Sequence, residues 1–345
     1  MPSILLIESS QTALAKLPSW TQMAVLVDQH TKAHCYPLVQ PWLPAHQLIE
    51  IPAGEEHKHL GTCELIWDAL TDHHFDRKSV LLNLGGGVIG DMGGFCAATF
   101  KRGIDFVQIP TTLLSQVDAS VGGKLGVDFR GFKNHLGVFQ VPRFVLVDVR
   151  FLTTLPEREL RSGFAEVIKH GLIADRAAWE VLSQAPLHQQ PWPETVAHSI
   201  AIKERVVALD PTEKGLRKIL NFGHTVGHAV ESWFLVNCQP NQRLLHGEAI
   251  AVGMVAEAWL SVQLGLLPER DLWAIEQYIF QIYGRAELPG AELPAMARLA
   301  LQDKKNEGQV ILASLLQSVG EAVFDVPLTE AQLVASLQYY RSRMA

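Results

Sequence analysis

The sequence predicts an α/β protein with an N-terminal Rossmann-like parallel-sheet domain and a mainly α-helical C-terminal domain. Before about residue 156, short β-rich runs alternate with helical stretches. This alternation is typical of a parallel sheet covered by helices on both faces. From Pro156 onward, apolar residues recur every three or four positions, as on the buried face of a helix. We therefore expect two domains, residues 1–156 and residues 157–345.

The expected strands of the first domain are short runs rich in aliphatic and aromatic residues. They are Ile4–Ile7, Ala24–Val27, Leu48–Ile51, Val80–Leu84, Phe106–Ile109 and Phe144–Val147. The expected helices of the second domain are Glu159–Ile173, Val196–Leu209, Thr225–Phe234 and Glu248–Leu264. Two late runs, Val310–Leu315 and Ala322–Val326, are separated by a glycine turn and predict a small hairpin.

Composition narrows the classes of function. With 345 residues, 48% of them hydrophobic, the chain can bury a large core. The net charge of -7 gives no uniform basic field, so we expect no nucleic-acid partner. There is no basic leader, and no run reaches the ~18 uncharged apolar residues that cross a membrane, so we expect a cytoplasmic protein without a membrane partner. The widely spaced Cys35, Cys63, Cys96 and Cys238 are expected to be free thiols.

A glycine-rich turn, Leu82–Asp91, directly follows an expected strand. It reads LNLGGGVIGD and fits G-x-G-x-x-G, whose backbone N–H groups can approach a pyrophosphate at a helix N-terminus. A glycine turn without a ligand explains the pattern equally well. The usual fingerprint has an acidic residue after the next strand, but here that strand runs into Pro110-Thr-Thr112. Asp28, which ends an earlier strand, is the better candidate for a ribose contact, with a plain turn aspartate as the alternative.

A second motif, Asn221–Glu231, reads NFGHTVGHAVE and contains two histidines. On a helix, His224 and His228 lie one turn apart and project from the same face, as metal ligands or substrate contacts must. Thr225 follows the first histidine where a zinc-protease helix has glutamate, so that chemistry is not expected. Histidines at this spacing are also common as structural or surface residues.

Further ligands for a metal occur elsewhere in the second domain. His246 lies at a glycine-marked helix start beside Glu248, where a third ligand could originate. Glu166, within Gly163–Gly171, is the candidate carboxylate. One carboxylate and two imidazoles leave open positions on Zn²⁺, as in catalytic sites.

Basic residues occur inside glycine-rich or apolar segments, where an anion site is possible. Each is also explained as a solvated surface charge. They are Lys124, Lys133, Lys169 and Arg217, with Lys304 and Lys305 near the expected hairpin.

Together these segments resemble the 3-dehydroquinate synthase family, from about residue 25 to residue 315. The matching motifs are Gly85–Asp91, Arg102-Gly, Pro110–Lys124, Glu166–Lys169, Gly215–Arg217, Asn221–His228 and His246–Glu248. The resemblance implies a Rossmann-like NAD domain, a helical second domain, an active site in the cleft between them and a homodimer. It also implies NAD and one divalent metal ion, zinc or cobalt, as cofactors.

The resemblance assigns roles position by position. It implies that the metal ligands are Glu166, His224 and His246. The implied substrate contacts are Arg102, from the neighbouring subunit, and Asp118, Lys124, Asn134, Lys169, Lys203, Arg217, Asn221, His228 and Lys305. Among these, the implied catalytic residues are Asp118, Lys124, Lys169, Asn221 and His228. The implied NAD contacts are Asp28, Glu55, Lys58, Gly86, Gly87, Val88, Asp91, Thr111, Thr112, Leu114, Lys124, Lys133, Phe151, Thr154 and Leu155.

The family's reaction converts a seven-carbon sugar acid phosphate, 3-deoxy-D-arabino-heptulosonate 7-phosphate, into 3-dehydroquinate and phosphate in the shikimate pathway of aromatic amino acid biosynthesis. The resemblance implies transient oxidation at C5, loss of phosphate, return of the hydride and ring closure. The sequence departs from the commonest pattern at Leu125–Arg130, so the loop before Asn134 is expected to differ in shape. Another sugar phosphate cyclase, a metal-dependent polyol dehydrogenase and an inactive NAD-binding protein remain as alternatives.

Overall fold

The structure, a computed structural model, describes residues 4–119, 122–130, 132–302 and 310–343. The chain divides into two compact units. Unit 1 consists of Met1–Leu160 and Trp192–Ile200, and unit 2 consists of Arg161–Pro191 and Ala201–Ala345. Along the chain, unit 1 first ends at Leu160, four residues after the expected boundary at residue 156. Unit 1 also includes Trp192–Ile200, a short segment from later in the chain.

Unit 1 is built on a parallel six-stranded sheet with the strand order β1-β8-β5-β4-β2-β3. Each of the six strands predicted for this domain is present within one residue of its predicted bounds. The strands are β1 (Ile4–Ile7), β2 (Met23–Asp28), β3 (Gln47–Ile51), β4 (Val80–Gly85), β5 (Asp105–Pro110) and β8 (Phe144–Val147). The parallel-sheet prediction for this region is confirmed.

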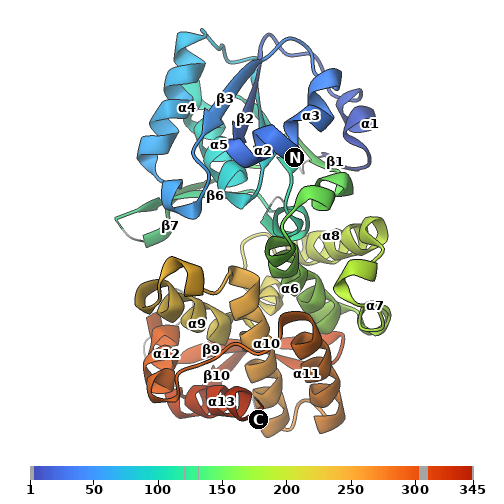
Figure 1. Cartoon of the computed structure of the whole chain (residues 1–345), viewed down its shortest axis with the longest axis vertical. Helices are drawn as coiled ribbons and strands as arrows, with labels where there is room; N and C mark the ends of the chain where they lie inside the picture. Colours follow the sequence, from blue (N-terminus) through green and yellow to red (C-terminus); the bar gives the residue numbers. More distant parts are fainter. Residues whose placement is uncertain (1–3, 120–121, 131, 303–309, 344–345) are drawn as a thin grey trace. The chain divides into compact units, whose positions relative to one another are not determined.

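Helices cover both faces of this sheet (Figure 1). They are α1 (Ser10–Leu14), α2 (Gln29–His34), α3 (Tyr36–Val39), α4 (Leu60–Asp72) and α5 (Gly87–Thr99). Side chains of a strand alternate between faces, so neighbouring residues of β2 enter different cores. Leu26 packs in the core with α4 and α5, whereas Val25 and Val27 pack in the core with α1 and α3. Burial on both faces explains why the strands read as continuous apolar runs.

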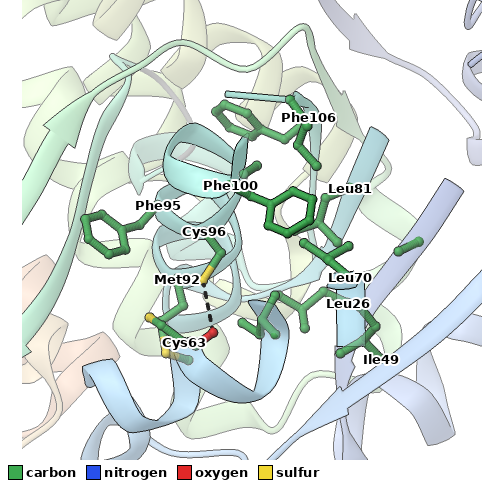
Figure 2. Packing of buried hydrophobic residues seen from close by; sticks show 14 of the residues in the cluster. Leu26, Ile49, Cys63, Leu70, Leu81, Met92, Phe95, Cys96, Phe100 and Phe106 are labelled. Carbon is green, nitrogen blue, oxygen red and sulfur yellow. Dashed lines mark hydrogen bonds between the residues drawn. The ribbon is translucent and has the colours of Figure 1, made fainter. Parts of the chain in front are cut away.

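Figure 2 shows the core on the α5 face, where Leu26, Leu81 and Phe100 pack together. Cys96 of α5 donates a hydrogen bond from Sγ to the carbonyl oxygen of Cys63 on α4, at 3.8 Å. All four cysteines are free, as predicted. This core holds α5, and therefore the glycine turn that precedes it, firmly against the sheet.

The order of the strands creates a switch point between β2 and β4. The chain leaves β2 to form β3 on one side and returns to form β4 on the other side of β2. At such a point the connections at the carboxyl ends diverge, which leaves a crevice where ligands bind in open α/β sheets. The strands that flank the crevice end at Asp28 and Gly85.

An antiparallel hairpin, β6 (Lys124–Phe129) with β7 (Phe132–Phe139), was not among the predicted strands. Gly126 and Gly137 interrupt its apolar alternation, which weakens the strand pattern in the sequence. At Gly137 a Cβ atom would lie 2.4 Å from the carbonyl oxygen of Leu125, so the close approach of the two strands requires glycine.

Unit 2 is mainly helical, as predicted (Figure 1). Its helices include α6 (Glu157–Ala174), α7 (Arg176–Leu182), α8 (Trp192–Leu209), α9 (His224–Asn237), α10 (His246–Gln263), α11 (Glu269–Tyr283), α12 (Leu293–Leu299) and α13 (Glu330–Ser342). The first residues of α6 and α8 belong to unit 1. Nearly every residue of α10 from Gly247 to Ser261 is buried, so this helix is apolar on all sides.

The predicted hairpin is also present in unit 2, as β9 (Ile311–Ser318) and β10 (Glu321–Leu328). Gly320 in its turn has φ of +89°, a conformation that favours glycine. No helix in the described ranges combines the length and apolarity needed to cross a membrane.

Candidate metal and cofactor sites

Glu166 lies on α6 and is almost completely buried, with 1% of its surface exposed. Its Oε2 accepts a hydrogen bond from the ammonium group of Lys169, one helical turn later. Its Oε1 has no hydrogen-bond partner among the described residues. A buried carboxylate oxygen without a donor is costly, so Oε1 marks a position where a cation or a donor is expected.

Two histidine rings face this oxygen. The Nε2 atoms of His224 and His246 lie 3.4 Å and 3.7 Å from Glu166 Oε1. The other ring nitrogens are occupied, because His224 Nδ1 lies 3.1 Å from the carbonyl oxygen of Phe222 and His246 Nδ1 lies 3.2 Å from Glu231 Oε2. One carboxylate oxygen and two Nε2 atoms therefore converge, a donor set that suits a catalytic zinc site.

Burial and neighbouring charges shift the pKa values of these groups. Burial raises the pKa of Glu166, but Lys169 and His224 outweigh this effect and hold the pKa well below its usual range. Burial and the charge of Lys169 lower the pKa of His224. Burial also lowers the pKa of His246, but Glu166 and Glu231 outweigh it and raise that pKa to about 10. Glu166 is consequently ionised at neutral pH, as a ligand for a divalent cation must be.

His228 lies beside this group, one turn after His224. Ring nitrogens of His224, His228 and His246 lie within 4.8 Å of one another. The ring centroids of His228 and His246 are 5.7 Å apart. The geometry therefore allows two ligand sets, which share His224 and His246 and differ in whether Glu166 or His228 is the third ligand.

The histidines meet because α9 and α10 pack backbone to backbone. A Cβ atom at Gly253 on α10 would lie 1.9 Å from the carbonyl oxygen of Gly223, and one at Gly227 would lie 3.1 Å from the carbonyl oxygen of Ala249. Side chains at these positions would push the two helices apart. The glycines of the NFGHTVGH motif thus set the distance between the helices that carry the histidines.

Glu257 fixes the start of α9 from the neighbouring helix. It is fully buried on α10, and its Oε2 and Oε1 accept hydrogen bonds from the backbone N–H groups of Gly223 at 2.6 Å and Val226 at 2.9 Å. The carboxylate satisfies donors that a helix N-terminus leaves open, and it interacts favourably with the helix dipole. His224 therefore begins α9 at a defined position.

A second close contact joins α10 to α6. The backbone N–H of Gly247 donates to Ser162 Oγ at 3.0 Å, and a Cβ atom at Gly247 would lie 1.9 Å from the carbonyl oxygen of Ser162. This contact holds His246, the preceding residue, against the helix that carries Glu166. The glycine after His246 is thus required by packing.

Three cationic side chains predicted to contact substrate are buried in unit 2. Lys169, Lys203 and Arg217 are 2%, 5% and 4% exposed. Such burial excludes the surface-charge interpretation of Lys169 and Arg217. Arg217 donates from Nη1 to the carbonyl oxygen of Pro211 at 2.8 Å, and Asn221, one turn later, donates from Nδ2 to Glu213 Oε1 at 3.0 Å.

In unit 1 the glycine turn lies at the switch point of the sheet. β4 ends at Gly85, Gly86 is the N-cap of α5, and Gly87 and Val88 form its first turn. Gly86 provides no side-chain cap, so the N–H groups of this turn can bind an anion. A Cβ atom at Gly86 would lie 3.1 Å from Thr112 Cγ2, which restricts the position to small residues.

Asp28, at the end of the adjacent strand, has a structural role. Its Oδ1 accepts hydrogen bonds from the backbone N–H groups of His30 at 2.9 Å and Thr31 at 2.8 Å, which caps α2. Asp28 is thus a helix-capping turn residue, as the alternative interpretation of the sequence proposed. Both hydrogen bonds use Oδ1, and the same carboxylate has a second oxygen at the carboxyl edge of the sheet.

Five predicted residues form a polar cluster near the start of α5. The Lys58 ammonium donates to Asp91 Oδ2 at 2.6 Å and to Asn134 Oδ1 at 2.7 Å. Burial lowers the pKa of Lys58, but the charges of Asp91 and Glu55 outweigh it and raise the pKa. Lys133 Nζ lies 3.9 Å from Glu55 Oε1. Asn134, assigned to substrate, thus lies among residues assigned to NAD.

Other residues assigned to NAD follow neighbouring strands. Thr111 is buried and donates its backbone N–H to the carbonyl oxygen of Gly85 at 3.0 Å. Thr112 and the half-buried Leu114 follow it in the chain. Phe151 is 1% exposed and belongs to the hydrophobic core, so any cofactor contact there must use its backbone. Exposed Thr154 and half-buried Leu155 come at the end of a 3₁₀ segment, Val149–Thr154.

The remaining predicted residues are Arg102, Asp118, Lys124 and Lys305. Arg102 and Lys124 are exposed, and Asp118 is half-buried in a π-helical turn, Ser115–Ala119. Arg102 has φ of +69° and follows Lys101 with φ of +49°, two consecutive left-handed residues that are not glycine. Lys305, like the alternative Lys304, falls outside the described residues.

Sequence reasoning missed the roles of Glu231 and Glu257. Glu231 stands at the end of the histidine motif, seven residues after His224, and therefore on the same face of α9. Glu257 lies within an otherwise apolar helix, and a buried acid in such a segment needs hydrogen-bond donors. The position of each glutamate was visible in the sequence, but the sequence did not show which groups form hydrogen bonds with it.

Comparisons with known proteins identify the family of this chain. Residues 48–162 match the family model described as 3-dehydroquinate synthase N-terminal, and residues 163–306 match 3-dehydroquinate synthase C-terminal. The 3-dehydroquinate synthase of Parabacteroides distasonis is 40% identical over 93% of this chain and 92% of its own length. That of Halorhodospira halophila is 45% identical over 87% of this chain and 85% of its own length.

Solved structures share the fold. The 2-epi-5-epi-valiolone synthase from Streptomyces hygroscopicus, with NAD⁺ and Zn²⁺ bound, has a TM-score of 0.88 and 27% identity, over 99% of this chain and 98% of that chain. A probable glycerol dehydrogenase from Sinorhizobium meliloti has a TM-score of 0.65 and 13% identity, over 99% of this chain and 97% of that chain. The second likeness extends to the fold alone.

Proposed function

This chain belongs to the 3-dehydroquinate synthase family, and from that premise we propose which of its residues carry out the reaction. By homology the chain is a phosphorus–oxygen lyase of the shikimate pathway. Its proposed substrate is 3-deoxy-D-arabino-heptulosonate 7-phosphate, and its proposed products are 3-dehydroquinate and phosphate. The observation that carries the assignment is the convergence of Glu166 Oε1 with the Nε2 atoms of His224 and His246.

Glu166, His224 and His246 are the proposed ligands of one divalent ion, zinc or cobalt. Glu166 Oε1 is a buried oxygen without a hydrogen-bond partner among the described residues, and both rings direct Nε2 toward it. When bound, such an ion acts as a Lewis acid that acidifies a coordinated hydroxyl group. Lys169 keeps Glu166 ionised, and His228 lies close enough to contact the substrate beside the ion.

NAD is proposed to bind at the carboxyl edge of the sheet in unit 1. The N–H groups at the Gly86–Val88 turn would bind the pyrophosphate, and Asp28 would accept a hydrogen bond from a ribose hydroxyl. When bound, NAD supplies reversible hydride transfer at the substrate's C5. The other proposed contacts are Glu55, Lys58, Asp91, Thr111, Thr112, Leu114, Lys124, Lys133, Phe151, Thr154 and Leu155.

The buried cationic residues are proposed to bind the anionic groups of the substrate. Lys169, Lys203 and Arg217 are held in a desolvated environment, where a hydrogen bond to a carboxylate or phosphate is stronger than in water. Charge-assisted contacts of this kind orient the substrate and stabilise the departing phosphate. The remaining proposed contacts to the substrate are Arg102, Asp118, Lys124, Asn134, Asn221, His228 and Lys305.

An assay for phosphate release from the heptulosonate phosphate tests this function. We expect release that depends on added NAD and on the metal, with no net accumulation of NADH, because the hydride is returned in each turnover. Stoichiometric NADH would indicate a polyol dehydrogenase. Release from a different sugar phosphate, with none from the heptulosonate, would indicate another cyclase.

The active form is proposed to be a homodimer in which Arg102 contacts the phosphate bound by the neighbouring subunit. Its exposure and the left-handed backbone at Lys101 and Arg102 support a contact directed away from its own fold. Mixing inactive Arg102→Met and Arg217→Met chains tests this, because only a heterodimer could assemble an intact site. Statistical mixing would restore about a quarter of the wild-type activity. No restoration would place Arg102 in its own subunit's site.

A further inference from the structure

The imidazole of His246 lies between two carboxylates. Its Nε2 is 3.7 Å from Glu166 Oε1, and its Nδ1 is 3.2 Å from Glu231 Oε2. The two nitrogens of an imidazole point away from each other, so Glu231 contacts the side of the ring that faces away from Glu166. Glu231 is therefore placed to support His246 rather than to join Glu166 in one coordination sphere.

His224 provides an internal comparison. Its Nε2 also faces Glu166 Oε1, at 3.4 Å, but its Nδ1 lies 3.1 Å from a neutral backbone carbonyl, that of Phe222. In both residues the Nδ1–H group donates a hydrogen bond, which leaves Nε2 as the nitrogen available to a metal. Only His246 is supported by a charged acceptor.

Glu231 reaches His246 because α9 and α10 are so close. It lies on α9, two helical turns after His224, and accepts a hydrogen bond from the first residue of α10. One face of α9 thus carries a proposed ligand and the support for a ligand on the other helix. Part of the Glu231 side chain, 20%, is exposed, so its charge is not deeply desolvated.

We propose that Glu231 is a positioning residue that holds His246 with Nε2 toward the metal and makes its imidazole a stronger ligand. This inference rests on the proposed role of His246 as a ligand. A carboxylate that accepts the Nδ1–H bond fixes the tautomer and the ring orientation, and it increases electron donation from Nε2. Glu231 touches neither substrate nor cofactor in this role and acts through His246.

The test measures zinc affinity by competition with a chromophoric chelator, using the full-length protein. The variants are Glu231→Gln, Glu231→Ala and His246→Ala. Asp271→Asn is the matched control, because Asp271 is also a partly exposed acid of unit 2, but its partners are Arg176 at 3.4 Å and Arg270 at 3.6 Å. Thermal unfolding of each metal-free protein shows whether a variant is folded and how much stability it has lost.

Glu231→Ala removes both the acceptor and the charge, and we expect zinc affinity to fall about 10- to 100-fold. Glu231→Gln keeps an acceptor oxygen in a side chain of similar shape, so its zinc affinity should fall less. We therefore expect zinc affinity to decrease from the wild type to Glu231→Gln and then to Glu231→Ala. Asp271→Asn should bind zinc like the wild type. The visible spectrum of the cobalt-loaded Glu231→Gln protein should also shift, because donation by His246 has changed.

Wild-type zinc affinity in both Glu231 variants, with affinity lost in His246→Ala, would overturn this inference and leave the proposed metal site intact. Wild-type zinc affinity in His246→Ala would overturn both the role of Glu231 and the proposed metal site. Loss of stability in the Glu231 variants without loss of zinc affinity would show that Glu231 only joins the two helices. Because Glu231→Gln preserves the size and polarity of the side chain, it remains informative if Glu231→Ala fails to fold.

Discussion

The two units present their ligands by different means. In unit 1 the proposed NAD site lies at the carboxyl ends of parallel strands, where Asp28 and the backbone of the Gly85–Val88 turn flank the switch point of the sheet. In unit 2 the proposed metal site consists of side chains from three helices, with Glu166, His224 and His246 separated by up to 80 positions. Strand order places the first site, whereas close packing of helices places the second.

This difference has consequences for tolerance to mutation. The proposed pyrophosphate contact in unit 1 is made by backbone N–H groups, which a side-chain substitution does not remove, so a single substitution should weaken NAD binding only moderately. A side-chain site depends on a few atoms and on the groups that hold them, such as Glu257 and the glycines between α9 and α10. Mutations in unit 2 should therefore have the larger and more specific effects.

Glu166→Gln should have the largest effect of the variants considered. The amide is a poor metal ligand, so we expect loss of bound metal and a fall in kcat/KM of roughly a thousandfold, which corresponds to about 4 kcal/mol. The change also removes the negative charge that pairs with the ammonium of Lys169, a side chain that is only 2% exposed. Breaking a buried pair in this way costs about 3–5 kcal/mol of the free energy of unfolding.

The double variant Glu166→Gln/Lys169→Met separates these two effects. Removing the unpaired ammonium should recover most of the lost stability in urea unfolding of the metal-free protein. Bound metal and phosphate release should stay low, because the ligand is still absent. Normal metal content in Glu166→Gln, measured by atomic absorption, would favour the alternative set in which His228 is the third ligand.

Arg217→Met and Lys124→Met test the anion contacts in the two units. Each should lower kcat/KM at least about a hundredfold, because a charge-assisted contact to a carboxylate or phosphate is lost from the transition state. Lys124 is exposed, so its replacement should change stability by less than about 0.5 kcal/mol. Without ligand, Arg217→Met should be less stable than the wild type by about 1 kcal/mol, because the carbonyl oxygen of Pro211 loses the hydrogen bond from Nη1 of the buried Arg217 side chain.

Lys16→Met is the control for these two variants, because Lys16 is an exposed lysine that is paired with Glu8 and is not among the proposed contacts. Its kinetics should be those of the wild type. Wild-type kinetics in both Lys124→Met and Arg217→Met would leave the substrate assignment without support, even with NAD and metal bound. Metal content must be measured alongside, so that a loss of metal is not mistaken for a loss of substrate binding.

The sequence predicted much of this architecture for identifiable reasons. All six sheet strands were predictable because a parallel sheet buried on both faces leaves continuous apolar runs. The hairpin β6–β7 was not, because Gly126 and Gly137 interrupt its alternation. The convergence of Glu166 with His224 and His246 followed from family motifs, since no local pattern relates positions so far apart. The partners of Glu231 and Glu257 depend on the packing of α9 against α10, which a single sequence does not reveal.

Gly253→Ala tests whether helix packing sets the metal site. The new methyl group would lie 1.9 Å from the carbonyl oxygen of Gly223, so α9 and α10 must separate. We expect a loss of about 1–3 kcal/mol in stability. Zinc affinity should fall about tenfold or more, because His224 and His246 are displaced from each other.

Gly93→Ala in α5 is the matched control in unit 1. Its methyl group would lie 2.0 Å from Oδ1 of the buried Asn83 side chain, so it disturbs packing within unit 1 without touching α9 or α10. It should lower stability and leave zinc affinity unchanged. Equal loss of zinc affinity in both variants would mean that general destabilisation, rather than the separation of α9 from α10, weakens the metal site.

Asp28→Asn should have the smallest effect and separates the two roles of that side chain. Asparagine caps a helix about as well as aspartate, so the cap on α2 and the free energy of unfolding should be preserved. The negative charge toward the ribose is lost, and NAD should bind about tenfold more weakly, since a hydrogen bond to a charged group contributes about 1.5–3 kcal/mol. Asp28→Ala should lose the same affinity and also about 1 kcal/mol of stability, because the cap is removed. Fluorescence titration with NADH measures the affinity, and zinc competition should show no change in either variant. If Asp28→Asn binds NADH like the wild type, the residue is only a helix cap, and the ribose must be recognised by another group at the edge of the sheet.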